Sequence, residues 1–256
     1  MKLVRFLIAI AMIIAPGGLS AQVFMGDFLH GSVIGQPFES TAFSSGNEGP
    51  VCEKWVGYWI NNPTKNALPP VAGGPLSWNG YGERGNSIVM GSGFPSGLKG
   101  RRGTSYVFSR PLVSGSIYLA FVIKPESIVN RKYWTQMGFC TNMKGGGPHC
   151  CVCFFPESSD GKSYNIGIRL VANIMIVDTV YKVGQKHLIV MKYDMDRHEV
   201  SVFVDPDLSK PEPLPDESVV YASSSEKTCG ISYRDVSDNT GLIGNFRVAR
   251  VWEDIR

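Results

Sequence analysis

The chain has 256 residues, of which 43% are hydrophobic and 18% are charged, and it contains 29 glycines and 16 prolines. This composition is too apolar for a disordered protein and too rich in turn-forming residues for a helical bundle. The net charge is only +3 and no dense basic run occurs, so nothing indicates a nucleic-acid partner.

The first 21 residues have the layout of a signal peptide. Lys2 and Arg5 precede an apolar run from Phe6 to Ala15, and helix breakers and small residues then lead to Ala21. This run is shorter than the roughly 18 apolar residues that a membrane anchor needs, and no later segment reaches that length. We therefore expect cleavage after Ala21, leaving residues 22–256 as a soluble protein that is secreted, periplasmic or held at the cell surface.

The first part of the mature chain, residues 22–111, predicts short strands between many turn formers. The candidates are Lys54–Ile60, Ser87–Met90 and Thr104–Phe108. A longer signal follows from Ser116 to Ile123, where both alternating faces are apolar. This pattern indicates a central strand that is covered on both sides.

The second half of the chain carries cleaner strand signals. Asn165–Leu170 alternates strictly, so its apolar residues would face a core while Asn165 and Arg169 face water. Leu188–Tyr193 and Glu199–Val204 flank a polar turn and predict a hairpin. A proline-rich loop from Asp205 to Ser218 precedes two further strands, Gly230–Tyr233 and Leu242–Val251.

The predicted elements are about a dozen short strands, without βαβ alternation or a convincing amphipathic helix. Short strands separated by turns favour two stacked antiparallel sheets. The expected fold is therefore an all-β sandwich that forms a single domain from residue 22 to residue 256.

Three C-terminal runs have strand-like patterns: His187–Asp194, Val200–Asp207 and Gly241–Trp252. The residues that match the pattern of the final strand are Phe246, Arg247, Val248, Trp252 and Asp254. The three runs resemble the closing strands of concanavalin A-like, laminin G-type jelly rolls of secreted bacterial proteins. Gly26–Phe28, Trp55–Trp59 and Leu76–Tyr81 resemble the opening strands more weakly. The resemblance implies a two-sheet antiparallel jelly roll, and it implies no activity because one fold serves many functions.

No catalytic signature accompanies these strands. The paired carboxylates of jelly-roll glycosidases are missing from any one strand, and the nearest acidic pairs lie in turns and loops. The four histidines, His30, His149, His187 and His198, are scattered. We therefore expect a protein without enzymatic activity, and a glycoside hydrolase or polysaccharide lyase with a non-standard site is the alternative.

Six cysteines give an even count, which permits disulfides in an exported chain: Cys52, Cys140, Cys150, Cys151, Cys153 and Cys229. Cys140 and either Cys150 or Cys151 bracket a glycine-rich loop, and a bridge there would stabilise the fold by about 2–3 kcal/mol. On an extended strand, His149, Cys151 and Cys153 would share one face, so a soft-metal site is an alternative use.

Sugars stack their C–H faces on exposed aromatic rings while nearby polar groups bind their hydroxyls. Trp78, Tyr81 and Trp134 lie in loop or strand-edge contexts beside Asn79 and Arg131, and we predict that these five residues bind ligand. Three other tryptophans, Trp55, Trp59 and Trp252, are expected in the core.

No cofactor is expected apart from calcium, for which the weak candidate ligands are Asp194, Asp196, Asp205 and Asp207. The sequence thus favours an exported, lectin-like carbohydrate-binding module whose partner is an extracellular glycan or glycoprotein. A protein-contacting adhesion or structural module at the cell surface is the second hypothesis.

Overall fold

The computed structural model describes residues 22–26, 55–60, 72–83, 87–91, 101–132, 134–142, 147–221 and 227–255. The expectations for the signal peptide, for His30 and for Cys52 lie outside these residues, as do those for the side chains of Trp55 and Trp59. Within the described residues, no helix is long and apolar enough to cross a membrane.

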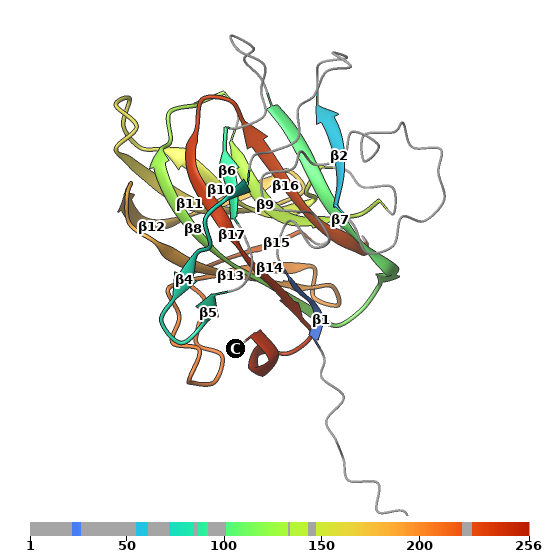
Figure 1. Cartoon of the computed structure of the whole chain (residues 1–256). Coiled ribbons are helices and arrows are strands. Elements are labelled where there is room, and N and C mark those ends of the chain that lie inside the picture. Colours follow the sequence, from blue (N-terminus) through green and yellow to red (C-terminus); the bar gives the residue numbers. More distant parts are fainter. Residues whose placement is uncertain are drawn as a thin grey trace, which may run out of the picture.

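The first of two large sheets, sheet A, follows the order β15-β14-β13-β8-β17-β6-β3, and β1 also pairs with β17 (Figure 1). Its strands are β1 (Gln22–Gly26), β3 (Ala72–Gly73), β6 (Ser87–Met90), β8 (Ser116–Ser127), β13 (His187–Asp194), β14 (Glu199–Val204), β15 (Glu217–Val220) and β17 (Thr240–Ala249). All of their pairings are antiparallel.

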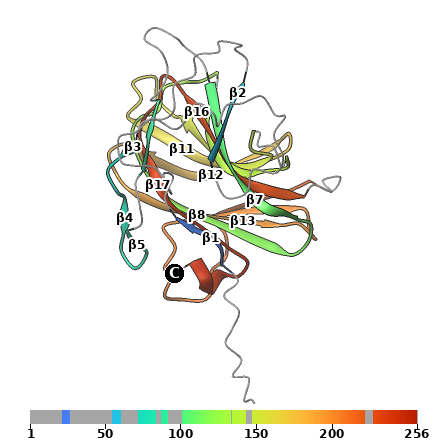
Figure 2. The same cartoon turned by 45° about the vertical axis from the view of Figure 1, so that its right-hand side comes forward.

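The second sheet, sheet B, follows the order β12-β11-β10-β9-β16-β7-β2 and stacks on sheet A (Figure 2). Its strands are β2 (Trp55–Ile60), β7 (Arg101–Leu112), β9 (Thr135–Cys140), β10 (Cys150–Pro156), β11 (Ser163–Leu170), β12 (Asn173–Lys182) and β16 (Thr228–Val236). These pairings are antiparallel as well. The predicted all-β, two-sheet antiparallel jelly-roll sandwich is confirmed.

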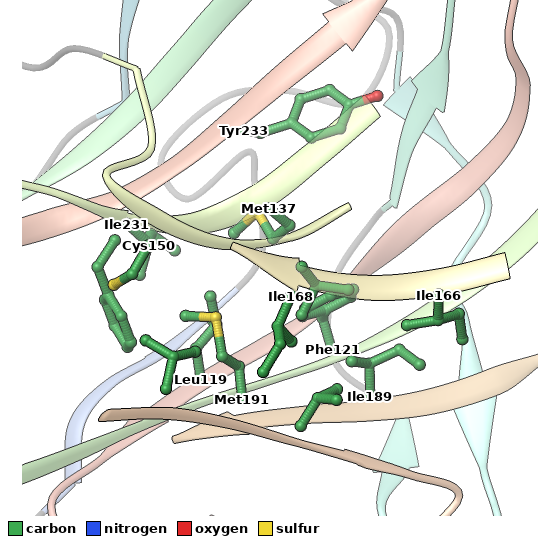
Figure 3. Packing of buried hydrophobic residues seen from close by; sticks show 14 of the residues in the cluster. Leu119, Phe121, Met137, Cys150, Ile166, Ile168, Ile189, Met191, Ile231 and Tyr233 are labelled. Atoms are coloured by element: carbon green, nitrogen blue, oxygen red, sulfur yellow. The ribbon is translucent and has the colours of Figure 1, made fainter. Parts of the chain in front are cut away.

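The main core lies between the two sheets, because every second residue of each strand points inward. Sheet A contributes Leu119, Phe121 and Met191, and sheet B contributes Met137 and Ile168, all with side chains no more than 1% exposed (Figure 3). This interdigitated layer removes the large apolar side chains of the cluster from water, which is the main stabilising term of a sandwich.

A second apolar layer covers the outer face of sheet A. On β8, Tyr118, Ala120 and Val122 point away from the main core and are buried in this layer. The cover comes from a small hairpin, β4 (Ser77–Trp78) and β5 (Gly82–Glu83), and from a terminal 3₁₀ helix, η2 (Trp252–Ile255). The prediction of a central strand that is apolar on both faces is therefore confirmed, and Trp252 lies in a core as expected, with 2% exposure.

The predicted hairpin of β13 and β14 is also confirmed, with Asp194 in register with Glu199. Its turn is stabilised by Asp194 Oδ1, which accepts the backbone N–H groups of Asp196 (3.1 Å) and Arg197 (3.0 Å). His198 follows with φ 51°, a left-handed conformation that completes the reversal. The acidic residues of this turn thus act on the backbone as turn formers.

Candidate functional site

A surface hollow of about 600 Å³ lies between the β4–β5 hairpin and the loop that follows β14. The hairpin contributes Trp78, Asn79 and Gly80, and the loop contributes residues 205–209. Trp78 is half-buried and packs against the apolar layer on sheet A, whereas Asn79 is exposed. The hollow therefore joins one fixed aromatic ring to a rim of polar groups.

The hairpin has a tight turn that presents Trp78 and Asn79. The Tyr81 N–H donates to Trp78 O (3.0 Å), and Gly80 adopts φ 74°, which a residue with a Cβ rarely does. Behind the turn, the Tyr81 hydroxyl donates to Asn245 O (2.9 Å), and Asn245 Nδ2 donates to Leu76 O (2.9 Å). These two buried bonds attach the hairpin to β17.

Arg247 of β17 completes this attachment. Its guanidinium lies 3.7 Å from the centre of the Tyr81 ring and donates to Tyr81 O through Nη2. Nη1 donates to Ile255 O (2.8 Å), and the whole residue is only 3% exposed. One buried cation therefore ties both the hairpin and η2 to sheet A, which fixes the position of the Trp78 ring.

The loop side of the hollow is held by Asp205. Its carboxylate accepts the Leu188 N–H at Oδ1 (2.8 Å) and contacts His187 Nδ1 at Oδ2 (2.7 Å). Its own N–H donates to Leu188 O (2.8 Å), and its φ of 54° turns the chain sharply out of β14. The side chain is still about one third exposed, so it can accept a further hydrogen bond from a ligand.

Asp207 is the second acidic group on the hollow. Oδ1 accepts hydrogen bonds from Ser209 N (3.0 Å) and Ser209 Oγ (2.6 Å), and Oδ2 lies 3.1 Å from Lys210 Nζ. The hydrogen bonds from Ser209, followed by that from Lys210, lower the pKa of Asp207, so the side chain is a carboxylate at neutral pH. The rim thus offers amide, hydroxyl and carboxylate groups around one ring.

The structure brings together only part of the predicted ligand-binding set. Trp78 and Asn79 line the hollow, but the Tyr81 ring is 1% exposed and packs under Arg247, so it is unavailable for stacking. Trp134 packs on Phe155 with ring centroids 4.7 Å apart, and exposed Arg131 lies nearby in sequence. Because Phe155 belongs to sheet B, this second group lies on the opposite side of the sandwich from Trp78.

The four predicted calcium ligands lie in two separate places. Asp194 and Asp196 lie at the turn of the β13–β14 hairpin, whereas Asp205 and Asp207 follow the far end of β14. Across the described ranges, no group of three or more His, Cys, Asp or Glu side chains could hold a metal ion. The two acidic pairs therefore cannot share one ion.

The predicted disulfide from Cys140 to Cys150 or Cys151 is not formed, and all five cysteines that the structure describes are buried free thiols. Cys150 faces the main core (Figure 3). It is in register with Phe139, whose side chain also belongs to that core. Cys140, one residue further along β9, points to the outer face instead. Cys151 does share that outer face, but its sulfur contacts Cys153, with 3.7 Å between the two Sγ atoms.

The alternative soft-metal site is also not assembled. The His149 ring packs 6.2 Å from the ring of Tyr193, a residue of the main core, while Cys151 and Cys153 point outward. Arg169 differs from expectation too. It is half-buried, donates from Nη2 to Pro148 O (2.7 Å), and is in register with Cys151. The two residues are 18 positions apart in the sequence, and only the pairing of β10 with β11 brings them together. The sequence therefore could not have revealed this contact.

No protein-family model and no curated protein matches the chain. Solved structures with a similar course of the chain include peanut lectin, at 13% identity and a TM-score of 0.44, over 77% of this chain and 98% of that one. The CBM2 module of the evolved Dit of Lactobacillus casei BL23 phage J-1 matches at 9% identity and a TM-score of 0.47, over 91% of this chain and 96% of that one.

A sialidase also matches, at 11% identity and a TM-score of 0.40, over 65% of this chain. The match spans only 15% of the sialidase itself. These likenesses concern the course of the chain alone. One fold serves many functions, so ligand and activity depend on the residues of the hollow.

Proposed function

We propose that the protein is a lectin-like module, acting outside the cytoplasm, that binds a glycan in the hollow between Trp78 and the 205–209 loop. The observation that supports this most directly is the lining itself, with one half-buried aromatic ring beside an amide, two carboxylates and a serine hydroxyl. A sugar ring presents an apolar C–H face and a periphery of hydroxyls, and this lining complements both.

Each residue of the hollow would contact a different part of the sugar. The C–H face of a sugar would stack on Trp78, whose position is fixed by the packing of the hairpin on sheet A. Asn79 would donate and accept at two adjacent hydroxyls, and Asp205 and Asp207 would accept hydrogen bonds from others. Because both carboxylates lie on the rim, we propose neutral, hydroxyl-rich sugars as the preferred class over acidic ones.

The first test is the variant Trp78→Ala, screened on a glycan array and then titrated with the best glycan by calorimetry. Loss of stacking on one ring removes on the order of 1 kcal/mol or more, so the affinity should fall several-fold. Circular dichroism should show an unchanged β spectrum, since the hairpin is held by Tyr81 and Leu76 rather than by Trp78.

The variant Trp134→Ala is the matched control, because this ring is also half-buried but lies on the other sheet. If it weakens binding while Trp78→Ala does not, the glycan occupies the side of Trp134 and Arg131, and the hollow is not the site. Cleavage of the bound glycan, lost on replacing Asp205 or Asp207, would instead place the protein among glycoside hydrolases or polysaccharide lyases.

One observation favours the second candidate function, a protein-contacting module. The edge strands β12 and β15 meet where Asn173 Nδ2 donates to Val220 O (3.2 Å). Along these two edge strands several apolar side chains are about half exposed: Met175 43%, Ile176 48%, Val180 54% and Val220 54%. Exposed apolar side chains on the edge strands of a sheet are typical of contact surfaces between proteins. If no glycan on the array binds and a protein ligand does bind, this candidate function is favoured.

A further inference from the structure

Sheet B carries a polar cluster on its outer face, away from the main core and from the hollow. On β10, Cys151 and Cys153 point outward while Cys150 and Val152 face the core. The Sγ atoms of Cys151 and Cys153 lie 3.7 Å apart, and both residues are fully buried. The spacing of two residues on a strand is what places both thiols on one face.

The neighbouring strands supply the surroundings of these thiols. Cys151 is in register with Gly138 on one side and with Arg169 on the other, and Cys153 is in register with Gln136. A Cβ at Gly138 would lie 2.5 Å from Cys151 Cα, so only glycine permits this close approach of β9 and β10. The two sulfurs are therefore held by the backbone of a central part of the sheet.

Two cations act on this pair. Arg169 comes from β11, and Arg234 comes from β16, where it is in register with Gln136. Burial alone would raise the pKa of Cys151. The hydrogen bond from Cys153 and the charges of Arg169 and Arg234 outweigh it and lower that pKa to about 7. By contrast, burial and the neighbouring Cys151 raise the pKa of Cys153, so Cys151 is the member of the pair that loses its proton first.

The cluster also contains polar atoms that are buried without a partner within the part of the chain that the structure describes. Gln136, only 2% exposed, contacts Cys153, yet its Oε1 accepts no hydrogen bond. The Nε atoms of Arg169 and Arg234 are buried and donate to no acceptor among the described residues. Buried polar atoms are normally satisfied, so this acceptor and these two donors mark a place for an additional small polar group beside the sulfurs.

We propose that Cys151 and Cys153 form a reactive dithiol that hydrogen peroxide converts to an intramolecular disulfide. The Cys151 thiolate attacks one peroxide oxygen, the O–O bond breaks, and the released hydroxide takes a proton to leave as water. This gives a sulfenic acid on Cys151, whose S–OH group is the small polar group that Gln136 and the arginines can bind. The sulfur of Cys153 then attacks the Cys151 sulfur, the S–O bond breaks, and the proton of Cys153 leaves with the hydroxyl as a second water.

The strand geometry favours reversal of this step by a thiol. Residues two apart on a strand have Cα atoms about 6.6–6.8 Å apart, at the upper end of the range that disulfides span. A bridge at this limit is strained, and strained bridges are the ones that thiols reduce readily. The two-electron oxidation by peroxide and the reduction by a dithiol therefore form a closed cycle.

The direct test uses the wild-type protein, treated with hydrogen peroxide and analysed by mass spectrometry of proteolytic peptides. We expect the peptide that contains Cys151 and Cys153 to lose two hydrogen atoms and to regain them with dithiothreitol. Cys140 and Cys229, which also neighbour each other, should stay reduced because burial raises both of their pKa values, that of Cys140 to about 12. Oxidation that begins at Cys140 and Cys229, or no oxidation of Cys151 at all, would overturn the proposal.

Three variants separate the roles. Cys153→Ser should leave a sulfenic acid on Cys151 that dimedone traps, whereas the matched control Cys150→Ser should still form the disulfide.

Iodoacetamide should label Cys151 with a rate that rises with pH through about 7. Arg169→Gln should move the midpoint of this rise to higher pH, because a positive charge next to the thiolate is lost. An unchanged pH profile in Arg169→Gln would contradict the assigned role of the arginine.

Discussion

Replacing Trp252 by alanine is expected to lower the free energy of unfolding by about 3–5 kcal/mol, the usual range for truncating a large aromatic side chain in a core. The Trp252 ring packs edge-on against Phe203 (5.2 Å between ring centroids) and Tyr118 (6.1 Å) in the second apolar layer. Its Nε1 donates to Lys210 O (3.0 Å), so the variant also removes this hydrogen bond.

Chemical denaturation followed by circular dichroism measures this loss. The matched control is Trp78→Ala, which removes the same side chain from a half-buried position at the edge of the same layer and should lower stability much less. Equal losses in the two variants would mean that Trp78 is a core residue, and the hollow would then lose its role as a binding site.

Replacing Arg247 by alanine is expected to have the second large effect, because it acts on stability and on ligand binding together. The buried carbonyls of Tyr81 and Ile255 would each lose a donor, and an unsatisfied buried polar group costs about 1–3 kcal/mol. We therefore expect the free energy of unfolding to fall by about 2–5 kcal/mol. Glycan affinity should fall as well, since the hairpin that carries Trp78 loses one of its attachments to β17.

Arg250→Ala serves as the control for Arg247→Ala. Arg250 also donates to a backbone carbonyl, that of Ser114 (2.7 Å), but the bond is exposed, so water can replace it. Its loss should change stability by less than about 1 kcal/mol and leave glycan binding intact. If Arg247→Ala destabilises the fold while the remaining folded protein binds glycan normally, the hairpin keeps its position without Arg247, and Arg247 is not its anchor.

The position of the candidate site was only partly accessible from the sequence. Trp78 and Asn79 were predicted because they lie in a turn-rich segment, where side chains are usually exposed. Asp205 and Asp207 were predicted only as candidate calcium ligands, and the structure places them opposite Trp78 on the hollow. The residues of the two walls are more than 120 positions apart, so only the folding of the hairpin onto sheet A brings them together.

The sequence by itself determined the architecture, because strand periodicity is a local property. A side chain on a strand alternates between two faces, so the apolar residues of β8 predicted that both of its faces are covered, and the polar turn between β13 and β14 predicted their hairpin.

What covers each face was decided only by the tertiary structure. Alternation places Arg169 on one side of a strand, and the local sequence places Tyr81 in a turn-rich segment, but neither pattern can tell whether water or another segment lies there. Tyr81 meets Arg247, 166 positions away, and Arg169 meets Cys151 through the register of β10 with β11. Likewise, Cys140 and Cys150 bracket one loop but face opposite sides of sheet B, since their register is offset by one residue. Pairing register and the packing of distant segments are non-local, and they decided which groups meet.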